Sequence, residues 1–353
     1  MISATQRQQP QGSAGGDRRL WAGIVRRRRM LLHVWRHEGL AAALWEIAYQ
    51  VLQPFVNLYT KAKWRHYQKI GHLSFTIAGS QMRLLSLDKG VSAELAVHRT
   101  HEPCASELLS QSLKPGMTFI DIGSNLGYYS LLANRIIGPT GRIVAIEPMP
   151  QNADVSRHNF LLNGAAKIIF RQIAISDHNG FLPLHLSDKS NWHSLNPVPW
   201  PTRELLVPAC TLDSLATELS LSRVDFIRMD LEGYETTVLN GMVETIAKHS
   251  PRLFVELHPH IVGIDPIREY LARLAELGYF PEWVLDQERD VPLRWRFLKP
   301  EHMSMCRLRD DWRINIHPRS LNVLFGRTSH GKQISMHSDW RTPTLAAIVQ
   351  QRA

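Results

Sequence analysis

Two apolar runs of the sequence end in acidic residues, one of them beside a histidine. The run at 226–229 leads into DLEGYE at 230–235, and the run at 252–255 leads into ELH at 256–258. In extended strands, residues two apart point to one face, so each run presents a pair of polar side chains on one face. Carboxylates gathered at such a place are costly unless they are solvated, paired or used in chemistry. We therefore expect the following residues to converge as catalytic residues: Asp230, Glu232, Glu256 and His258.

A glycine-rich turn follows another short apolar run, 118–122, and opens a helix. Glycines in a tight turn let a ligand approach the backbone, and the N-terminus of the helix offers free N–H groups. A dinucleotide site requires glycine where Asn125 stands, so a pyrophosphate ligand and a dehydrogenase are disfavoured. The acidic Asp121 before the turn favours an ammonium group instead. A cationic amino acid joined to a ribose satisfies these conditions, which points to S-adenosylmethionine as the cofactor.

A second acid is placed to bind the ribose of that cofactor. Glu147 ends the run at 142–146, where a carboxylate can accept hydrogen bonds from both ribose hydroxyls. The alternative is that Glu147 caps the helix after Pro148. Ser176 and Asp177 follow the third apolar run and are expected to border the adenine, although Asp177 is equally suited to capping a turn. The predicted cofactor-binding residues are Asp121, Gly123, Ser124, Asn125, Gly127, Tyr128, Glu147, Pro148, Ser176, Asp177 and Asp230.

The cluster of acids suggests a proton transfer. A neutral hydroxyl acceptor must lose its proton as the methyl group moves, and we expect His258 or Glu232 to take it. Asp230 would orient the methionine end of the cofactor or the base. The carboxylates at 230, 232 and 256 could instead hold Mg²⁺, but a network with Arg228 is favoured over a metal.

Seven apolar runs predict the strands that position these residues. They lie at 118–122, 142–146, 167–173, 224–229, 252–257, 279–284 and 321–325. Helical stretches alternate with them, at 128–137 and 151–162 for example. This alternation predicts an α/β fold, a doubly wound and mostly parallel seven-stranded sheet of the Rossmann-like type, with ligands at the carboxyl ends of the strands. The predicted segments are a disordered basic arm (1–20), a helical and hairpin extension (21–104), the main domain (105–329, with an insertion at 286–318) and a tail (330–353).

These motifs, in this order, resemble the FkbM-type family of S-adenosylmethionine-dependent methyltransferases. The resemblance covers roughly residues 105–285 and the final strand, and its most specific part is the D-x-E-G-x-E pattern at 230–235. Asn159 with Asn163 also matches, whereas Arg228 stands where the family more often has lysine. The resemblance implies methyl transfer to oxygen, typically on sugar hydroxyls of glycans, lipid-linked saccharides or natural products. Residues 1–100 and 286–318 lie outside it and are expected to choose the substrate.

The positive charge is concentrated at the N-terminus. Residues 1–40 hold eight arginines against two acids, so they carry six of the nine net positive charges. Apolar residues then recur at helical spacing from Leu40 to Phe55, with Pro54 as the expected break, and a basic stretch with aromatics follows at 61–69. This pattern suits peripheral contact of residues 18–69 with an anionic membrane. An ordinary helix packed on the main domain is the slightly favoured interpretation.

Composition narrows the cellular locations and the rival functions that fit the sequence. No apolar run reaches about 18 residues and no signal-peptide layout is visible, so a cytoplasmic protein with some membrane association is expected. Three cysteines about a hundred residues apart suit neither a disulfide framework nor a zinc site. The rival functions are an RNA-directed methyltransferase and a non-catalytic membrane-docking protein. Nucleic acid is disfavoured because the 313 residues after position 40 carry only three net charges.

Overall fold

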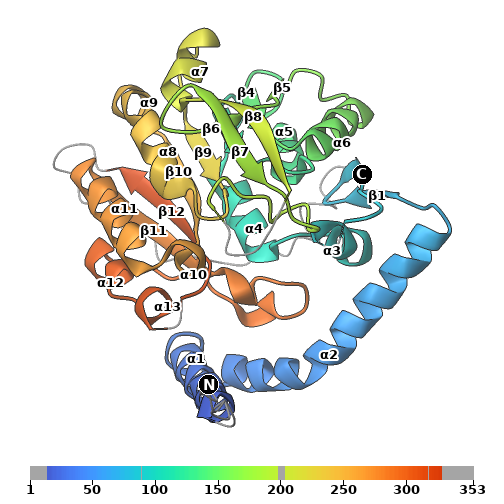
Figure 1. Cartoon of the computed structure of the whole chain (residues 1–353), viewed down its shortest axis with the longest axis vertical. Helices are drawn as coiled ribbons and strands as arrows, with labels where there is room; N and C mark the ends of the chain where they lie inside the picture. Colours follow the sequence, from blue (N-terminus) through green and yellow to red (C-terminus); the bar gives the residue numbers. More distant parts are fainter. Residues whose placement is uncertain (1–13, 89, 198–202, 317, 328–353) are drawn as a thin grey trace, which may run out of the picture. The chain divides into compact units, whose positions relative to one another are not determined.

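The computed structural model describes residues 14–88, 90–197, 203–316 and 318–327 (Figure 1). The chain divides into two compact units, Met1–Gln53 and Pro54–Ala353. The second unit contains a seven-stranded sheet, a three-stranded sheet and a two-stranded hairpin. The predicted tail at 330–353 and the first 13 residues lie outside the described residues.

Two long helices begin the described chain, α1 (Ala14–Glu38) and α2 (Leu40–Lys69). The intervening Gly39 has φ of +94°, a conformation that favours glycine. α1 takes in residues 14–20, where the sequence predicted a disordered arm, although Gly15, Gly16 and Asp17 are poor helix formers. α2 continues through Pro54, so the predicted break is wrong. Trp64, ten residues further on, is buried in the core of the second unit and helps to hold the turns beyond the proline.

Neither helix, nor any other in the described part of the chain, combines the length and the apolar character that a membrane crossing requires.

The central sheet has the predicted doubly wound, mostly parallel form with seven strands. Its order is β11-β12-β10-β9-β3-β4-β5. The parallel strands are β3 (Thr118–Ile122), β4 (Arg142–Ile146), β5 (Ile169–Arg171), β9 (Phe226–Met229) and β10 (Arg252–Leu257). β12 (Leu321–Arg327) pairs antiparallel with both β10 and β11 (Tyr279–Asp286). The chain order reverses between β3 and β9, and ligands of such sheets bind at this switch point.

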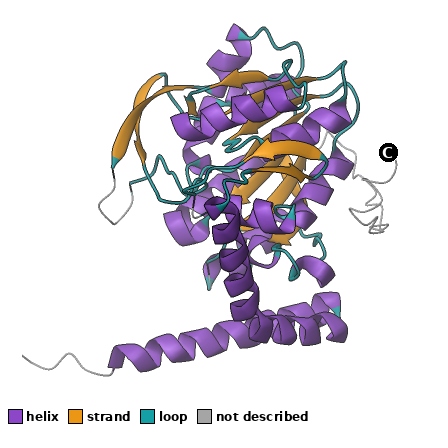
Figure 2. Cartoon of the chain, turned by 90° about the vertical axis from the view of Figure 1, so that its right-hand side faces the viewer, coloured by secondary structure: helices purple, strands orange, loops and turns teal. Residues whose placement is uncertain are grey.

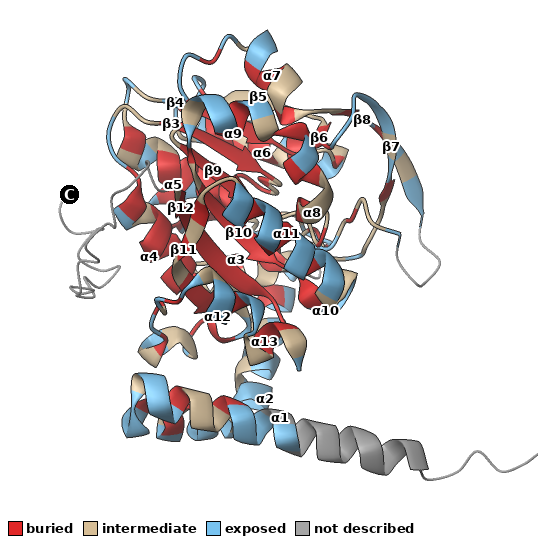
Figure 3. Cartoon of the chain, turned by 90° about the vertical axis from the view of Figure 1, so that its left-hand side faces the viewer, coloured by how far each residue is buried: buried red, intermediate tan, exposed pale blue. Residues whose placement is uncertain are grey.

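Helices cover both faces of the sheet (Figure 2). One face packs against α4 (Pro103–Ser112), α5 (Tyr128–Ile137) and α6 (Pro150–Leu162). The other packs against α7 (Leu212–Glu218), α8 (Glu235–Val238), α9 (Val243–His249), α11 (Ile264–Glu276), α12 (Met305–Arg309) and α13 (Trp312–Asn315). The central strands are buried along their length, as Figure 3 shows, so their positions are fixed by packing on two sides.

Strand alternation decides which face the polar residues occupy. Phe119, Phe226 and Phe254 all point into the core beneath α4 and α5. Asp121, Arg228 and Glu256 lie two residues further along the same strands and therefore point to the same face. The polar groups thus gather at the carboxyl ends of β3, β9 and β10, next to the start of α4 and α5.

The third predicted strand, 167–173, is shorter in the structure, where β5 spans residues 169–171. Only β5 joins the main sheet, and the chain then forms β6 (Ala174–Ile175) of a separate sheet with order β6-β8-β7. This second sheet was not predicted from the sequence. Its other strands are β7 (Gly180–His185) and β8 (Glu204–Cys210). Residues 186–197 of the loop between them reach back to the carboxyl ends of the main strands.

The predicted hairpin consists of β1 (Ser74–Ile77) and β2 (Ser80–Arg83). Asn163 accepts a bond from the Gln81 amide (2.9 Å) and donates to its carbonyl (2.7 Å), and Asn159 does the same with Arg83 (2.7 and 3.2 Å). Two side-chain amides, one on α6 and one directly after its end, therefore substitute for a neighbouring strand. This gives the two asparagines, which match the family pattern noted above, a structural role in this chain. α3 (Val91–His98) follows the hairpin.

The insertion at 286–318 is a packed structure of short helices: η2 (Gln287–Arg289), η3 (Trp295–Phe297), α12 and α13. Its Arg313 is fully buried and pairs with Glu301 (2.6 Å) and Asp311 (2.9 Å). The remaining short helix, α10 (Pro259–Val262), follows β10 directly.

Candidate active site

The glycine turn after β3 is pressed against the end of β9. Gly123 has φ of +82°, and a Cβ there would lie 2.1 Å from the carbonyl oxygen of Asp230. At Gly127, a Cβ would lie 2.6 Å from the ring of Phe160. Both glycines are therefore required by close approach as well as by conformation. Asn125 between them also has positive φ (+49°), which asparagine tolerates better than most residues.

Glu147 lies beside this turn, as predicted. Its carboxylate accepts bonds from the backbone amides of Asn125 (3.0 Å) and Met149 (2.9 Å) and from the side chain of Asn152 (3.4 Å). Burial raises the pKa of Glu147 to about 7 despite these bonds. Glu147 and Pro148 line a small hollow of about 50 Å³ together with Gly123, Asp230 and Glu232. The bond to Met149 shows that Glu147 also supports the start of α6, so the two predicted roles coexist.

The surroundings of this hollow contain polar atoms without a hydrogen-bond partner. They are buried, and they belong to residues of the glycine turn and its neighbours: Ser124 Oγ, Asn125 Oδ1, Asn152 Oδ1 and Asn191 Oδ1. Buried groups of this kind are rare unless something binds them. The chemistry of these atoms suits a ligand rich in hydroxyl, amine and ring nitrogen groups, such as S-adenosylmethionine.

A loop from the second sheet roofs the hollow. The carbonyl oxygen of Ser190 accepts bonds from the side chains of Asn125 and Asn152, both at 3.0 Å. Asp88, just before α3, accepts bonds from the amide (2.8 Å) and hydroxyl (2.9 Å) of Ser190. Asp88 also accepts from the amide of Ser92 in the first turn of α3 (2.8 Å). Ser190 therefore connects the extension before the sheet, through Asp88, to the glycine turn, through Asn125.

Asp121 is fully buried and faces Arg228 instead of an open site. The guanidinium group of Arg228 donates to Asp121 (3.2 Å), to the carbonyl oxygen of Gly123 (3.2 Å) and to Asp230 (2.9 Å). It also lies over the ring of Tyr129, 4.2 Å from its centroid. The prediction that Asp121 pairs directly with an ammonium group therefore differs from the structure: Asp121 holds Arg228, and Arg228 holds the turn and Asp230.

Three of the four predicted catalytic residues converge around the imidazole of the fourth, His258. His258 Nε2 lies 3.3 Å from Glu256, 3.7 Å from Glu232 and 3.9 Å from Asp230. On the other side of the ring, Nδ1 lies 3.2 Å from Glu235. The convergence expected from strand alternation is thus present in the structure. Glu235 was not assigned a role from the sequence, although it belongs to the D-x-E-G-x-E pattern.

The cluster contains more acids than cations. Burial lowers the pKa of His258, but Glu235 and Glu256 outweigh it and raise that pKa well above its ordinary value. Burial also raises the pKa of Glu232 well above its usual range and that of Glu256 to about 7. Asp230 is raised for the same reason, despite Arg228 and His258. An imidazolium surrounded by carboxylates with elevated pKa values can exchange protons near neutral pH.

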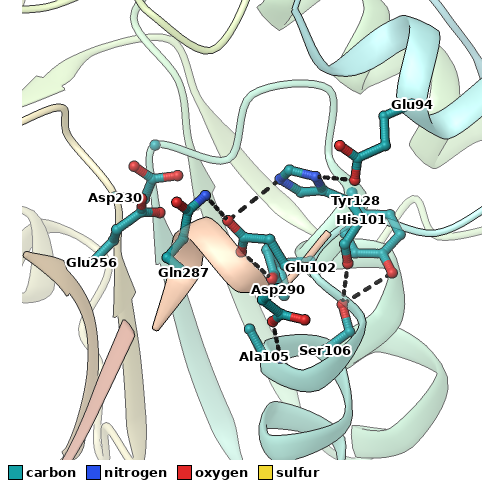
Figure 4. Close-up of polar contacts among 12 residues, drawn as sticks. Glu94, His101, Glu102, Ala105, Ser106, Tyr128, Asp230, Glu256, Gln287 and Asp290 are labelled. Carbon is teal, nitrogen blue, oxygen red and sulfur yellow. Dashed lines mark hydrogen bonds and ion pairs between the residues drawn. The ribbon is translucent and has the colours of Figure 1, made fainter. Parts of the chain in front are cut away.

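Next to this cluster is a cavity of about 590 Å³, and part of its wall comes from outside the strand ends. Glu102, immediately before α4, accepts bonds from Tyr129 OH (2.7 Å) and Gln287 Nε2 (3.1 Å). His101 lies 3.8 Å from Glu102 and 3.0 Å from Glu94 (Figure 4). Glu102 has φ of +41°, an unusual conformation for a non-glycine residue that turns the chain into α4.

The pKa values of this wall differ from those of the cluster. Burial works to raise the pKa of Glu102, but His101 and Arg228 outweigh it and lower that pKa. Burial works to lower the pKa of His101, but Glu102 and Glu94 raise it to about 9. Behind them, burial raises the pKa of Asp290 to about 8, while its carboxylate caps the first amides of α4 at Cys104 (2.8 Å) and Ala105 (2.7 Å).

The remaining predicted cofactor residues lie at different places. Ser124, Asn125 and Tyr128 line the larger cavity, and the hydroxyl of Tyr128 contacts Ser106 (3.0 Å). Ser176 and Asp177 line neither of the two cavities described above. Ser176 instead contacts Tyr234 OH at 3.0 Å. Their role toward the adenine stays a prediction.

One set of groups within the cluster has the spacing of metal ligands. Atoms of Asp230, Glu235 and His258 lie within 4.8 Å of one another. Each has a partner in the chain, however: Asp230 contacts Arg228 (2.9 Å), and Glu235 accepts the amide of Leu231 (2.7 Å) and contacts His258 (3.2 Å). A cation at this place would have to compete with the guanidinium group of Arg228.

Comparison with known proteins identifies the domain. Residues 121–281 match the family described as methyltransferase FkbM domain. The chain is 27% identical over 239 residues to a 2-O-methyltransferase NoeI from Sinorhizobium fredii, covering 61% of this chain and 92% of that protein. It is 32% identical over 109 residues to a protein-L-isoaspartate O-methyltransferase from Triticum aestivum, covering 31% of this chain and 44% of that protein.

A solved methyltransferase FkbM from Methylobacillus flagellatus KT is 18% identical, with a TM-score of 0.32, over 52% of this chain and 47% of that one. The matched segment, 121–281, contains the glycine turn, Glu147 and the whole acid–imidazole cluster, whereas Glu102 and Gln287 lie outside it. Residues 121–281 are therefore a methyltransferase domain of the FkbM type, and the chain is an S-adenosylmethionine-dependent methyltransferase.

Proposed function

We propose that the protein transfers a methyl group to a hydroxyl oxygen of an uncharged, sugar-like acceptor. The observation that carries this proposal is the position of Glu232, which lines both the small hollow beside Glu147 and the large cavity next to it. A carboxylate at that junction can reach an acceptor hydroxyl while the donor occupies the neighbouring site. The 2-O-methyltransferase relative supports oxygen as the acceptor atom.

The cofactor would be held by the residues of the small hollow and by the part of the glycine turn that lines the large cavity next to it. Glu147 would accept the ribose hydroxyls, and the unpartnered side-chain oxygens of Ser124 and Asn125 would take further bonds. S-adenosylmethionine supplies an electrophilic methyl group when it is bound. Arg228, fixed by Asp121 and Asp230, keeps the glycine turn in register with the end of β9. The protein's contribution at this end is orientation and the exclusion of water.

Glu232 is the proposed base. His258 is buried, and its elevated pKa keeps it protonated at neutral pH, so it is poorly suited to accept a proton. The pKa of Glu232 lies above its usual range, which makes its carboxylate a stronger base than a solvated glutamate. The imidazolium at 3.7 Å keeps Glu232 near the cavity and favours its ionised form before the transfer. His258 therefore acts as a positioning residue, and Glu256 supports it from the neighbouring strand.

The charges of the cavity restrict the acceptor. Three cationic groups line the cavity: the imidazoles of His101 and His258, whose pKa values are raised, and the guanidinium of Arg228. Five carboxyl groups line it as well, those of Glu102, Asp230, Glu232, Glu256 and Glu288. An anionic group brought next to the ionised carboxylate of Glu102 is repelled, by about 3 kcal/mol at a separation of about 6 Å and an effective dielectric constant of about 20. Carboxylates and the amide of Gln287 suit hydroxyl groups, which are good donors to such acceptors.

The same charges argue against an RNA acceptor. Most of the net positive charge that could attract phosphates lies in residues 1–40, whereas five carboxylates line the cavity. A polyanion reaching into the cavity would have to place phosphates near Glu102 and Glu288.

The test is a matched set of acceptors assayed for S-adenosylhomocysteine release: neutral hexosides and deoxyhexosides, the corresponding uronic acids, and a short RNA. Neutral sugars should be methylated at oxygen, with uronic acids slower by tenfold or more in kcat/KM. Mass spectrometry of the product gives the methylated atom. Transfer to nitrogen, or a preference for the uronic acid or the RNA, would refute the proposal.

A further inference from the structure

A continuous apolar stripe runs along the exposed side of α2. Its members recur at intervals of three or four residues, the spacing of one helix face. They are large, and 48 to 68% of each remains exposed: Leu40, Leu44, Ile47, Val51, Phe55 and Leu58. Leu52 and Tyr59 widen the stripe on one side. Scattered exposed hydrophobic residues are ordinary, but six in register on one helix mark an interaction surface.

The opposite side of the same helix is buried. Ala42, Tyr49 and Trp64 are all less than a tenth exposed, and so is Glu46, the single acid of α2. α2 is therefore covered along one side and uncovered along the other, and its exposed side carries no carboxylate. The stripe is therefore not the side of α2 that packs against the rest of the protein, since that side is already buried.

Positive charge continues the stripe at its C-terminal end. Arg65 and Lys69 extend the spacing of Val51 and Leu58, and both are exposed. Lys61 is exposed on the flank, and Lys63 donates to the hydroxyl of Tyr59 (3.0 Å), so that an aromatic ring and an ammonium group lie together at the edge. In the first unit, Arg27, Arg28, Arg29 and Arg36 are exposed on α1. Apolar side chains flanked by cations and aromatics suit the boundary between acyl chains and anionic headgroups.

We propose that the α2 stripe (residues 40–58) lies in the surface of an anionic lipid membrane and docks the enzyme there. The apolar residues enter the acyl boundary, and the cations at 61, 65 and 69 contact the headgroups. Charge complementarity selects this occupant over a second copy of the chain, because two such stripes facing each other would bring their cationic ends together or leave them without partners. The docking is separate from the methyl transfer and does not depend on the identity of the acceptor.

The test is vesicle flotation of the full-length protein with phosphatidylcholine alone and with added phosphatidylglycerol. The wild type should float only with the anionic vesicles, and salt at about 1 M should reduce the bound fraction. The double variant Val51→Asp, Phe55→Asp should lower that fraction at least about tenfold, since two apolar anchors become anions. Phe181→Asp on β7 is the matched control, because Phe181 is as exposed as Phe55 (66 and 68%) but lies outside the stripe. It should float like the wild type.

Two readouts separate the remaining outcomes. S-adenosylmethionine binding by all variants verifies that they are folded. Equal flotation of the double variant and the wild type would overturn the proposal, as would wild-type protein that binds neither kind of vesicle. If light scattering shows a wild-type dimer that the double variant breaks, while no vesicle binds, the stripe is a self-association surface and membrane docking is wrong.

Discussion

The carboxylates of Glu102, which is buried, and Glu232, which is partly buried, line the same cavity, yet their surroundings move their pKa values in opposite directions. Glu102 has bonds from Tyr129 and Gln287 and the cations His101 and Arg228 nearby, so its charged form is stabilised. Glu232 shares a single imidazolium with Glu256, Glu235 and Asp230, so its charged form is poorly compensated. A carboxylate that stays ionised is suited to binding, and one that readily takes a proton is suited to catalysis.

The difference also separates two parts of the chain. Glu232 lies within the segment that defines the family, whereas Glu102 and Gln287 lie before and after it. The chemistry is thus built from strand ends that the fold positions in a fixed way. The wall that meets the acceptor is contributed by a turn before α4 and by the start of the insertion. A variant of Glu232 should therefore change kcat, whereas variants of Glu102 and Gln287 should change KM for the acceptor.

Replacing the base should have the largest effect. Glu232→Gln keeps the shape of the side chain but cannot accept the proton, so kcat should fall by about 10²–10⁴ while cofactor affinity stays within about twofold. Calorimetry and product release measure the two quantities. Glu218→Gln is the control, because Glu218 is an exposed glutamate on α7 that pairs only with Arg171 at the surface (3.0 Å). A kcat for Glu232→Gln close to that of the control would exclude Glu232 as the base.

Removing the ribose acceptor should act on cofactor binding instead. Glu147→Ala deletes charge-assisted hydrogen bonds worth about 1.5–3 kcal/mol, so S-adenosylmethionine should bind about 100-fold more weakly. Because the pKa of Glu147 is about 7, the wild-type affinity should also rise as pH increases from 6 to 8, while the carboxylate becomes ionised. Calorimetric titrations at several pH values measure both effects. A variant with undiminished affinity, or a flat pH profile, would assign the ribose to other residues.

The pH profile of the rate should reflect the cluster. A base must be ionised to act, so log kcat should rise with a slope of about one below the pKa of Glu232 and level off above it, with a midpoint well above the ordinary pKa of a glutamate. Glu256→Gln removes a like charge that raises the pKa of Glu232, so the midpoint should move to lower pH. Stopped assays across pH 5–9 give the profile. A midpoint that moves upward or stays fixed in this variant would contradict the proposed coupling.

The second wall should change the Michaelis constant for the acceptor. Glu102→Gln retains an oxygen for Tyr129 but weakens bonds to acceptor hydroxyls, so KM for the acceptor should rise about tenfold with little change in kcat. Gln287→Ala, which removes the neighbouring amide, should act in the same direction. Steady-state kinetics with saturating cofactor separate the two constants. If kcat falls instead, Glu102 takes part in the chemistry and the contrast between the walls is wrong.

Chelation should have the smallest effect. Asp230 is paired with Arg228 and Glu235 with the amide of Leu231, so EDTA should change the rate by less than about twofold. Rates with EDTA and with EDTA plus excess Mg²⁺ provide the measurement. A large loss that Mg²⁺ restores would show that Asp230, Glu235 and His258 bind a cation.

The sequence predicted the strands of the main sheet and the meeting of Asp230, Glu232, Glu256 and His258. Buried parallel strands form continuous apolar runs, and their carboxyl ends must lie at one edge, so local pattern determines global position. Glu102 gave no such signal, because its place in the cavity depends on a left-handed turn and on helix packing. The second sheet was missed for a related reason. β6 has only two residues, and its partners are distant in the chain.

Pro54 shows that a rule based on neighbouring residues can also predict a helix break that the structure does not have. A proline inside a helix costs about 3 kcal/mol, which predicts a break when nothing else is considered. Trp64 and Tyr67 pack against the core around Phe75, so burial beyond the proline compensates for the lost backbone bond. Tertiary contacts of this kind are not visible in the residues next to the proline.

The attachment of the roof through Ser190 has a consequence for truncated forms of the enzyme. Asp88 holds that serine from the extension, outside the segment that defines the family, while Asn125 and Asn152 hold it from within. A fragment beginning near residue 105 would keep every residue assigned to the chemistry but lose the hydrogen bonds from Ser190 to Asp88. Its roof would be freed on one side, water would enter beside Glu147, and the fragment should bind its donor more weakly than the intact chain.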